Sequence, residues 1–256
     1  MIALLFLGNS YTFVNDLNLV VESALEQGSP AFADTQTTRL AEGGYTFADH
    51  VARVDTDPVW ADALLHGSYQ WGILQDQSEI PGFHGEDPVW DTDAAAGAQL
   101  DDWLEAQGSQ TVLLLTWGRR DGDSQNPDLY PDFPTMQDQL TDGYLAYRDL
   151  YSTADRPVWV APAGLAFAKI YDETGDPTDP NSLFYRLYQT DGSHPSMSGT
   201  WLVACTVYAT LTGRSPEGLW PPPGVDPVEG EHLASVAADV VLNGADGLSY
   251  PWQTPR

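Results

Sequence analysis

The first dozen residues constrain the fold of this chain most. Six apolar residues, Ile2 to Leu7, run directly into Gly8, Asn9 and Ser10. A short apolar run closed by a glycine is typical of a buried strand that ends abruptly. A strand that leads through Gly-x-Ser into a helix presents the serine hydroxyl at the carboxyl end of a central strand, beside backbone N–H groups. Ser10 is therefore a candidate nucleophile, although glycine and serine are also ordinary turn residues.

The rest of the chain alternates between apolar runs and helical patterns. Further strands are predicted at residues 35–40, 69–74, 111–116 and 157–162. The predicted helices are 17–25, 46–54, 58–66, 93–106, 135–152, 164–171, 181–188, 197–211 and 231–242. This alternation predicts an α/β fold, a flavodoxin-like three-layer α/β/α sandwich around a mostly parallel five-stranded sheet. With no internal repeat and no long linker, residues 1–256 are expected to form a single domain.

A second motif near the far end of the chain completes a possible catalytic set. Asp191-Gly192-Ser193-His194-Pro195 stands just before a predicted helix, so Ser10, His194 and Asp191 supply the three members of a hydrolytic triad. At this point the sequence resembles the SGNH (GDSL-type) hydrolases, a superfamily of esterases and lipases. Gly8-Asn9-Ser10-Tyr11-Thr12 is similar to the family's first block, with Asn9 where many members carry aspartate, and residues 191–195 are similar to its last. The string from Gly8 to Leu17 resembles a largely uncharacterised bacterial subfamily.

The resemblance also implies an oxyanion hole. Its donors would be the backbone N–H groups of Ser10 and Gly44 and a side-chain amide after the third strand. The family carries asparagine at that last position, whereas this chain has Gln77. Glutamine has the same amide on a stem one methylene longer, so it can donate if its backbone sits farther back. Gln77 could otherwise be an ordinary polar loop residue.

Four residues are predicted to contact substrate. Asn9 adjoins the nucleophile, and Trp117, Arg119 and Arg120 follow the clearest buried strand. Loops at the carboxyl ends of parallel strands form the ligand crevice, so Trp117 is expected to be a stacking wall and one arginine a donor. The alternative is a structural pairing of these arginines with Asp121 and Asp123.

No metal site and no cofactor are predicted. The spacing Asp121-x-Asp123-x-x-Asn126-x-Asp128 suggests calcium, but the glycine and the bidentate glutamate of an EF-hand loop are missing.

The charge balance limits the partners. The chain carries 37 acidic and 10 basic residues, a formal net charge of -27. Such a field repels nucleic acid and anionic membrane surfaces, so neither is an expected partner, and no apolar stretch is long enough to span a membrane. The acidity would serve solubility or a salty habitat, or else an acidic rim for the substrate.

The compartment and the oligomeric state do not follow from the sequence. The single cysteine, Cys205, excludes an intrachain disulfide, and it lies in an apolar helical run that favours a buried thiol. Residues 2–7 lack the basic leader and the cleavage site of a signal peptide. If an export signal has been removed, the protein would be secreted or periplasmic, and otherwise cytoplasmic.

Together these features predict a serine hydrolase that cleaves carboxylic esters through an acyl-enzyme. Short-chain or acetyl esters, small or on carbohydrate, are the expected substrates, because short polar loops argue against long-chain lipids. The alternative from another class is a non-catalytic glycan-binding protein on the same fold, which the change to Gln77 would permit. A glycosidase with paired carboxylates is a third reading, favoured only by the abundant Asp and Glu.

Overall fold

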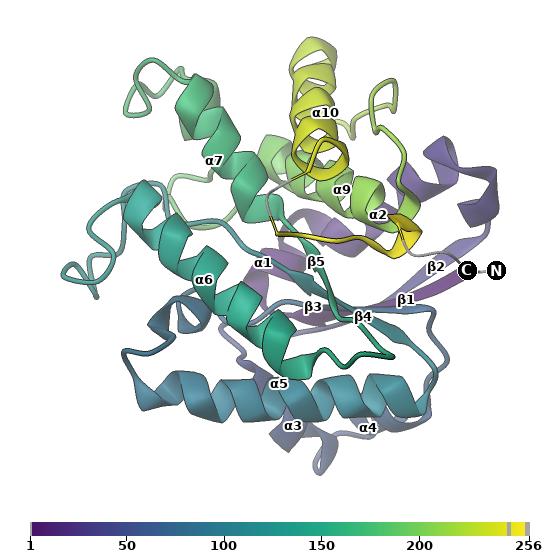
Figure 1. Ribbon diagram of the computed structural model, residues 1–256. Helices are drawn as coiled ribbons and strands as arrows, with labels where there is room; N and C mark the ends of the chain where they lie inside the picture. The colour runs from purple at the N-terminus through teal and green to yellow at the C-terminus, as the bar shows by residue number, and fades with distance from the viewer. Residues whose placement is uncertain (1, 245–246, 254–256) are drawn as a thin grey trace.

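Five parallel strands form the centre of the computed structural model (Figure 1), which describes residues 2–244 and 247–253. The strands are β1 (Ile2–Gly8), β2 (Thr35–Ala41), β3 (Trp71–Leu74), β4 (Gln110–Leu114) and β5 (Trp159–Ala161). All four pairings are parallel, in the order β2-β1-β3-β4-β5. The predicted α/β sandwich is therefore confirmed, with a sheet that is wholly rather than mostly parallel.

The strand order places a switch point between β1 and β3. From β1 the chain moves outward to β2, then crosses back to β3 on the other side of β1. In open α/β sheets the crevice outside the carboxyl ends of the strands at such a point is the usual ligand site. Ser10 follows β1 and Gln77 follows β3, so the topology brings both to this edge.

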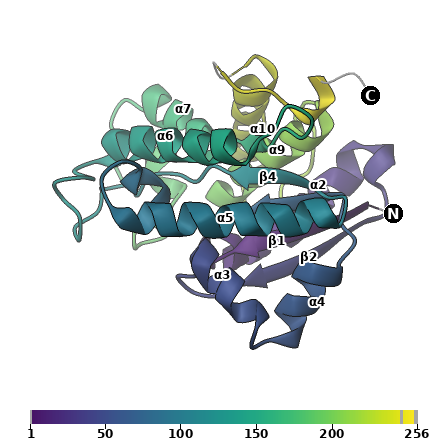
Figure 2. The ribbon, with the colours of Figure 1, turned by 60° about the horizontal axis from the view of Figure 1, so that its bottom comes forward.

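Side chains alternate between the two faces of the sheet, as the pleat requires. In β1, Leu4 and Phe6 belong to one apolar core, and Leu5 and Leu7 to the other. The first core lies against α2 (Leu17–Gly28), α7 (Ala163–Glu173), α9 (Met197–Thr212) and α10 (Pro227–Leu242). The second lies against α3 (Phe47–Val54), α4 (Pro58–His66), α5 (Pro88–Ala106) and α6 (Phe133–Tyr151). Figure 2 shows α5 running across this second face, beside α3 and α4.

Several helices begin earlier than predicted, and the reason is a single local signal. Asp87 and Asp226 cap the N–H groups of the first turn, with proline at the first helical position of α5 and α10. Proline is favoured there because its missing N–H would have no partner in the helix. The same Asp-Pro pair begins α4 at Asp57 and Pro58, where the observed start agrees with the predicted one. The predicted helix over 181–188 shrinks to α8 (Leu183–Arg186), and β3 begins at Trp71 rather than at residue 69.

No helix in the described ranges combines the length and the apolar character that crossing a membrane would require.

Candidate active site

The candidate nucleophile stands where β1 turns into α1 (Ser10–Phe13). Ser10 is the first residue of this short helix, and Asn9 caps it by accepting from the N–H of Tyr11 at 3.1 Å. Gly8 leaves room for a hydrogen-bonded pair of side chains, because a Cβ there would lie 2.4 Å from Thr12 Oγ1 and 2.5 Å from Gln75 Oε1. The turn therefore leaves the Ser10 side chain partly exposed at the strand end.

The structure brings the three predicted triad residues together. Ser10 Oγ lies 2.8 Å from His194 Nε2, and His194 Nδ1 lies 2.7 Å from Asp191 Oδ2. With Nδ1 protonated, Nε2 is free to accept the serine proton. The arrangement thus has the geometry of a nucleophile, a general base and an orienting carboxylate.

Asp191 is held in its ionised form by its own turn. Its Oδ1 accepts from the N–H groups of Ser193, at 2.9 Å, and His194, at 3.0 Å. Partial burial favours the neutral acid, but these two N–H groups and the His194 ring outweigh it, so the pKa of Asp191 is lowered. The carboxylate is therefore charged at neutral pH and can stabilise an imidazolium.

One buried side chain connects the turns that carry the three proposed oxyanion donors. Asn9, only 2% exposed, donates from Nδ2 to the carbonyl oxygens of Tyr45, at 3.0 Å, and Asp76, at 3.4 Å. Asn9 adjoins Ser10, Tyr45 adjoins Gly44, and Asp76 adjoins Gln77. This corrects the prediction that Asn9 contacts substrate, because its amide faces protein carbonyl groups.

The backbone donors of this set are unused within the part of the chain that the structure describes. Neither Ser10 N–H nor Gly44 N–H donates to another described residue. Gly44 is exposed and has φ +73°, in the left-handed region that favours glycine. Both groups are therefore available to a ligand.

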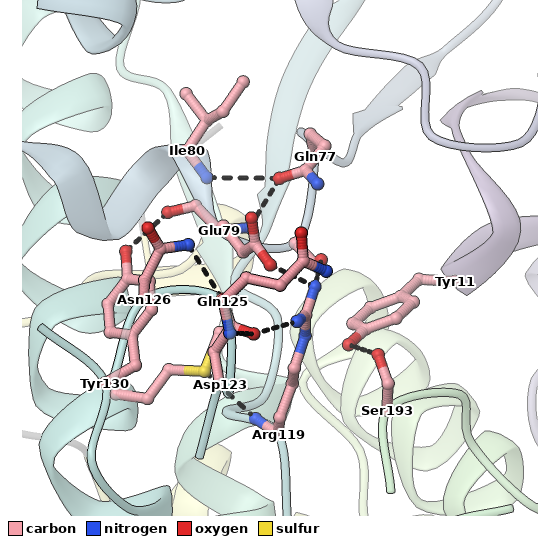
Figure 3. A network of polar contacts seen from close by, with 12 residues as sticks. Tyr11, Gln77, Glu79, Ile80, Arg119, Asp123, Gln125, Asn126, Tyr130 and Ser193 are labelled. Atoms are coloured by element: carbon pink, nitrogen blue, oxygen red, sulfur yellow. Dashed lines mark hydrogen bonds and ion pairs between the residues drawn. The ribbon is translucent and has the colours of Figure 1, made fainter. Parts of the chain in front are cut away.

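Gln77 is anchored through its oxygen, which leaves its nitrogen available. Oε1 accepts from the N–H of Glu79 at 2.7 Å and of Ile80 at 3.3 Å (Figure 3). Nε2 has no partner among the described residues. The amide is thus fixed in the orientation in which an N–H donor, rather than the oxygen, can meet a substrate.

Two fully buried polar side chains beneath the site carried no signal in the sequence. Asp76 Oδ1 accepts from the N–H groups of Gln77, at 2.7 Å, and Phe47, at 3.2 Å. Burial and the nearby Asp93 raise the pKa of Asp76 well above its ordinary value. On the other side, His50 Nε2 lies 2.9 Å from the carbonyl oxygen of Gly8, so both side chains brace the turns around Ser10.

The structure corrects the predicted substrate contact of Trp117. Its side chain is fully buried, stacked between Tyr11 and Phe167, with ring centroids 4.7 and 4.8 Å away. A tryptophan enclosed in this way cannot be a stacking wall for substrate. It forms instead part of the core behind the turn that carries Ser10.

The two arginines form the structural ion pairs that were the alternative. Arg119 pairs with Asp123 at 2.6 Å and also with Glu79 (Figure 3). Arg120 pairs with Asp121 at 2.7 Å, and its guanidinium lies 3.8 Å from the ring centroid of Tyr185.

The segment with calcium-like spacing is also occupied by internal contacts. Asp123 accepts from Arg119, from the N–H of Gln125 at 3.0 Å and from Asn126 Nδ2 at 2.8 Å. Within residues 2–244 and 247–253, no cluster of three or more His, Cys, Asp or Glu side chains is arranged to hold a metal.

No protein-family model and no curated protein matches the chain by sequence. Its fold, however, matches solved structures over most of their length. A DUF4886 family protein from Bacteroides uniformis is 17% identical, with a TM-score of 0.69 and 99% of each chain covered. A candidate SGNH hydrolase from Slackia heliotrinireducens is 23% identical, with a TM-score of 0.62 over 82% of this chain and 98% of its own.

Another solved structure with this fold is that of Axe2, an acetylxylan esterase from Geobacillus stearothermophilus. It is 14% identical, with a TM-score of 0.56 over 80% of this chain and 91% of its own. Catalytic mutants of Axe2 replace a serine, an aspartate or a histidine by alanine. These likenesses establish that the chain has the fold of the SGNH hydrolases.

Proposed function

We propose that this chain, which has the fold of the SGNH hydrolases, is a serine esterase acting on neutral carboxylic esters of short acyl groups. The observation that carries the proposal is the unbroken contact from Ser10 Oγ through the His194 imidazole to Asp191, at 2.8 and 2.7 Å. Ser10 and His194 are 184 positions apart in the sequence, and they meet at an imidazole whose side chain is partly exposed.

The proposed reaction has two steps. His194 Nε2 takes the proton of Ser10 as Oγ attacks the ester carbonyl, and Asp191 stabilises the imidazolium that forms. The tetrahedral oxyanion accepts hydrogen bonds from the backbone N–H groups of Ser10 and Gly44 and from the Nε2 amide of Gln77. Collapse expels the alcohol, which takes its proton from His194, and leaves Ser10 acylated. Water, activated by His194, then releases the acid.

Charge and fold suggest which esters are used. The net charge of -27 disfavours substrates that carry carboxylate or phosphate groups. The Axe2 esterase, which removes acetyl groups from xylan as its name states, shares this fold. We therefore propose acetyl and other short neutral esters, small or on carbohydrate, as substrates.

A serine-directed probe tests the proposal. A fluorophosphonate is expected to label the wild-type protein at Ser10, and p-nitrophenyl acetate to be hydrolysed. Ser10→Ala is expected to abolish both, whereas the matched control Ser23→Ala, an exposed serine of α2, keeps both. Absence of labelling in the wild-type protein, or hydrolysis by Ser10→Ala at the wild-type rate, would reject the assignment and favour a binding protein.

A further inference from the structure

The residue after the nucleophile is held more rigidly than a turn residue needs to be. Tyr11 is 2% exposed, and its ring lies nearly parallel to that of Trp117, with an interplanar angle of 4°. Trp117 in turn stacks on Phe167 at 10°. This three-ring column extends from the nucleophile turn into the core, so the Tyr11 ring has no room to change its orientation.

The hydroxyl at the end of this fixed ring meets the turn that carries the proposed acid–base pair. Tyr11 Oη lies 2.7 Å from Ser193 Oγ, and Figure 3 shows the two hydroxyl groups pointing toward one another. Trp117 Nε1 donates to the carbonyl oxygen of the same residue, Ser193, at 3.1 Å. Two neighbouring rings of the column therefore hold both the side chain and the backbone of Ser193.

Ser193 connects the contacts of Tyr11 and Trp117 to the proposed triad. It stands between Asp191 and His194, and its N–H donates to Asp191 Oδ1 at 2.9 Å. The Tyr11 ring also meets the His194 imidazole edge-on, with centroids 5.7 Å apart. Tyr11 thus contacts two residues of this turn, Ser193 and His194, while Ser78 and Arg119 lie near the same hydroxyl.

The backbone of the turn is held at Gly192, whose carbonyl oxygen accepts from the Arg120 N–H at 2.8 Å, and at His194, whose carbonyl oxygen accepts from the Gln189 N–H at 2.8 Å. Its side chains are open to solvent. The side chains of Asp191 and His194 are 47% and 31% exposed, and Gly192 has φ +69°. An exposed turn samples neighbouring positions unless contacts from the interior hold it, and a displacement near 1 Å costs roughly 10²-fold in rate.

We propose that Tyr11 is a positioning residue of the proposed esterase: through Ser193, its hydroxyl fixes the 191–194 turn so that His194 Nε2 stays aligned with Ser10 Oγ. The inference rests on the proposed function. It adds a residue whose hydroxyl bonds Ser193 rather than a member of the proposed triad, and whose ring packs edge-on against His194.

Tyr11→Phe removes this hydroxyl and keeps the stacked ring. We expect kcat for p-nitrophenyl acetate to fall by about 10-fold with KM unchanged, because alignment rather than substrate binding is lost. Ser193→Ala is expected to lower kcat by a similar factor. The double variant should be no slower than either single variant, because both remove the same bond.

The matched control is Tyr188→Phe. Tyr188 is also buried, and its hydroxyl donates to the carbonyl oxygen of Gly118 at the same 2.7 Å. This variant removes an equivalent bond outside the 191–194 turn, so it should lower the melting temperature comparably and keep kcat within about 2-fold. An equal loss of kcat in Tyr188→Phe would mean general loosening and would overturn the inference.

A second measurement separates the inference from the proposed function. The His194 Nδ1–H proton, bonded to Asp191, should give a downfield NMR signal that broadens or shifts in Tyr11→Phe but not in Tyr188→Phe. If wild-type protein is active and Tyr11→Phe keeps full kcat, the inference fails while the esterase assignment stands. If no ester is hydrolysed and no probe reacts, the assignment fails, and the NMR signal alone decides whether Tyr11 positions the turn. If the decreases in kcat of Tyr11→Phe and Ser193→Ala multiply in the double variant, Tyr11 does not act through Ser193 and the inference is rejected.

Discussion

Asn9 Nδ2 donates to the carbonyl oxygen of Tyr45 across 3.0 Å, and this contact connects the turn that carries Ser10 to the loop that contains Gly44. The same amide reaches the carbonyl oxygen of Asp76, beside Gln77. The proposed oxyanion donors come from three separate turns, and preorganised donors are effective only if their relative positions are fixed. Asn9 supplies that connection.

Asn9→Asp is therefore expected to be damaging, although the resemblance to SGNH hydrolases would suggest that aspartate is acceptable. A carboxylate at this buried position would face two carbonyl oxygens and could donate to neither. We expect a loss of about 2–3 kcal/mol in the free energy of unfolding, measured by urea titration. Asn18→Asp is the matched control: Asn18 is 6% exposed and also loses a donor, from Nδ2 to Thr37 Oγ1 at 3.0 Å, but the charge of Arg39, which donates to its Oδ1, can stabilise a carboxylate there. Equal losses in the two variants would contradict the specific role of Asn9.

Gln77→Glu separates the anchoring oxygen from the donating nitrogen. Glutamate keeps an acceptor for the N–H groups of Glu79 and Ile80 but loses the Nε2 donor. Because one oxyanion donor is typically worth about 10²–10³ in rate, we expect kcat/KM to fall by at least about 10²-fold without unfolding. Gln125→Glu adds the same charge on an exposed residue drawn nearby in Figure 3 and should retain activity. Near wild-type activity in Gln77→Glu would remove Gln77 from the oxyanion hole.

The sequence was sufficient for those features that depend on local chemistry and order. A buried run that ends at Gly8 positions Ser10 through backbone geometry, and the Asp-x-x-His spacing lets Asp191 bond both the N–H and the ring of His194. Four of the five strands followed from apolar runs between helical patterns, and β2 followed from a β-prone run rich in threonine. These signals are short-range, so they survive without knowledge of the tertiary packing.

The direction in which a loop side chain points did not follow from the sequence. Trp117 and Arg119 stand at the correct sheet edge, yet Trp117 faces the core and Arg119 faces Glu79 and Asp123. These directions depend on distant partners: Glu79 lies 40 positions from Arg119, and Tyr11 lies 106 positions from Trp117. The bracing by Asp76 and His50 was missed for the same reason, since nothing in either residue's neighbourhood marks it as buried.

The ionisation of Glu79 is expected to make the free energy of unfolding depend on pH. Burial raises the pKa of Glu79 to about 7, against the opposing charge of Arg119 and with help from Asp123. The folded protein therefore binds this proton more tightly than the unfolded chain does. The resulting contribution to the free energy of unfolding is full below about pH 4.5 and is lost as pH rises through 7.

Glu79→Gln should remove the loss of stability that is expected as pH rises through 7. Relative to this variant, the wild-type free energy of unfolding should fall by at most about 3 kcal/mol between pH 5 and 8, since one pKa unit is worth about 1.4 kcal/mol. Urea titrations across this range test it, with the exposed Glu105→Gln as control. Parallel curves for Glu79→Gln and the wild type would show that Glu79 ionises as freely as in the unfolded chain.

The ionisation of His50 is expected to change the free energy of unfolding with pH in the opposite direction. Its ring is fully buried, bonded through Nε2 to the carbonyl oxygen of Gly8 and through Nδ1 to Trp60 Nε1, which donates at 3.0 Å. Burial lowers the pKa of His50 to about 4, despite the bond to Gly8 and the nearby Asp49. The unfolded chain therefore binds the proton more tightly, and stability that is full above about pH 6.5 is lost as pH falls toward 4.

The two effects can be told apart by substitution. His50→Gln keeps a neutral amide beside Gly8, so its free energy of unfolding should vary less than that of the wild type between pH 6.5 and 4.5, whatever its value at pH 7. The exposed His84→Gln should follow the wild type. Because protonation places a second proton between Nδ1 and the Trp60 N–H, acid should also weaken the brace on Gly8, two residues before Ser10. A wild type as stable at pH 4.5 as at pH 7 would contradict the role of His50.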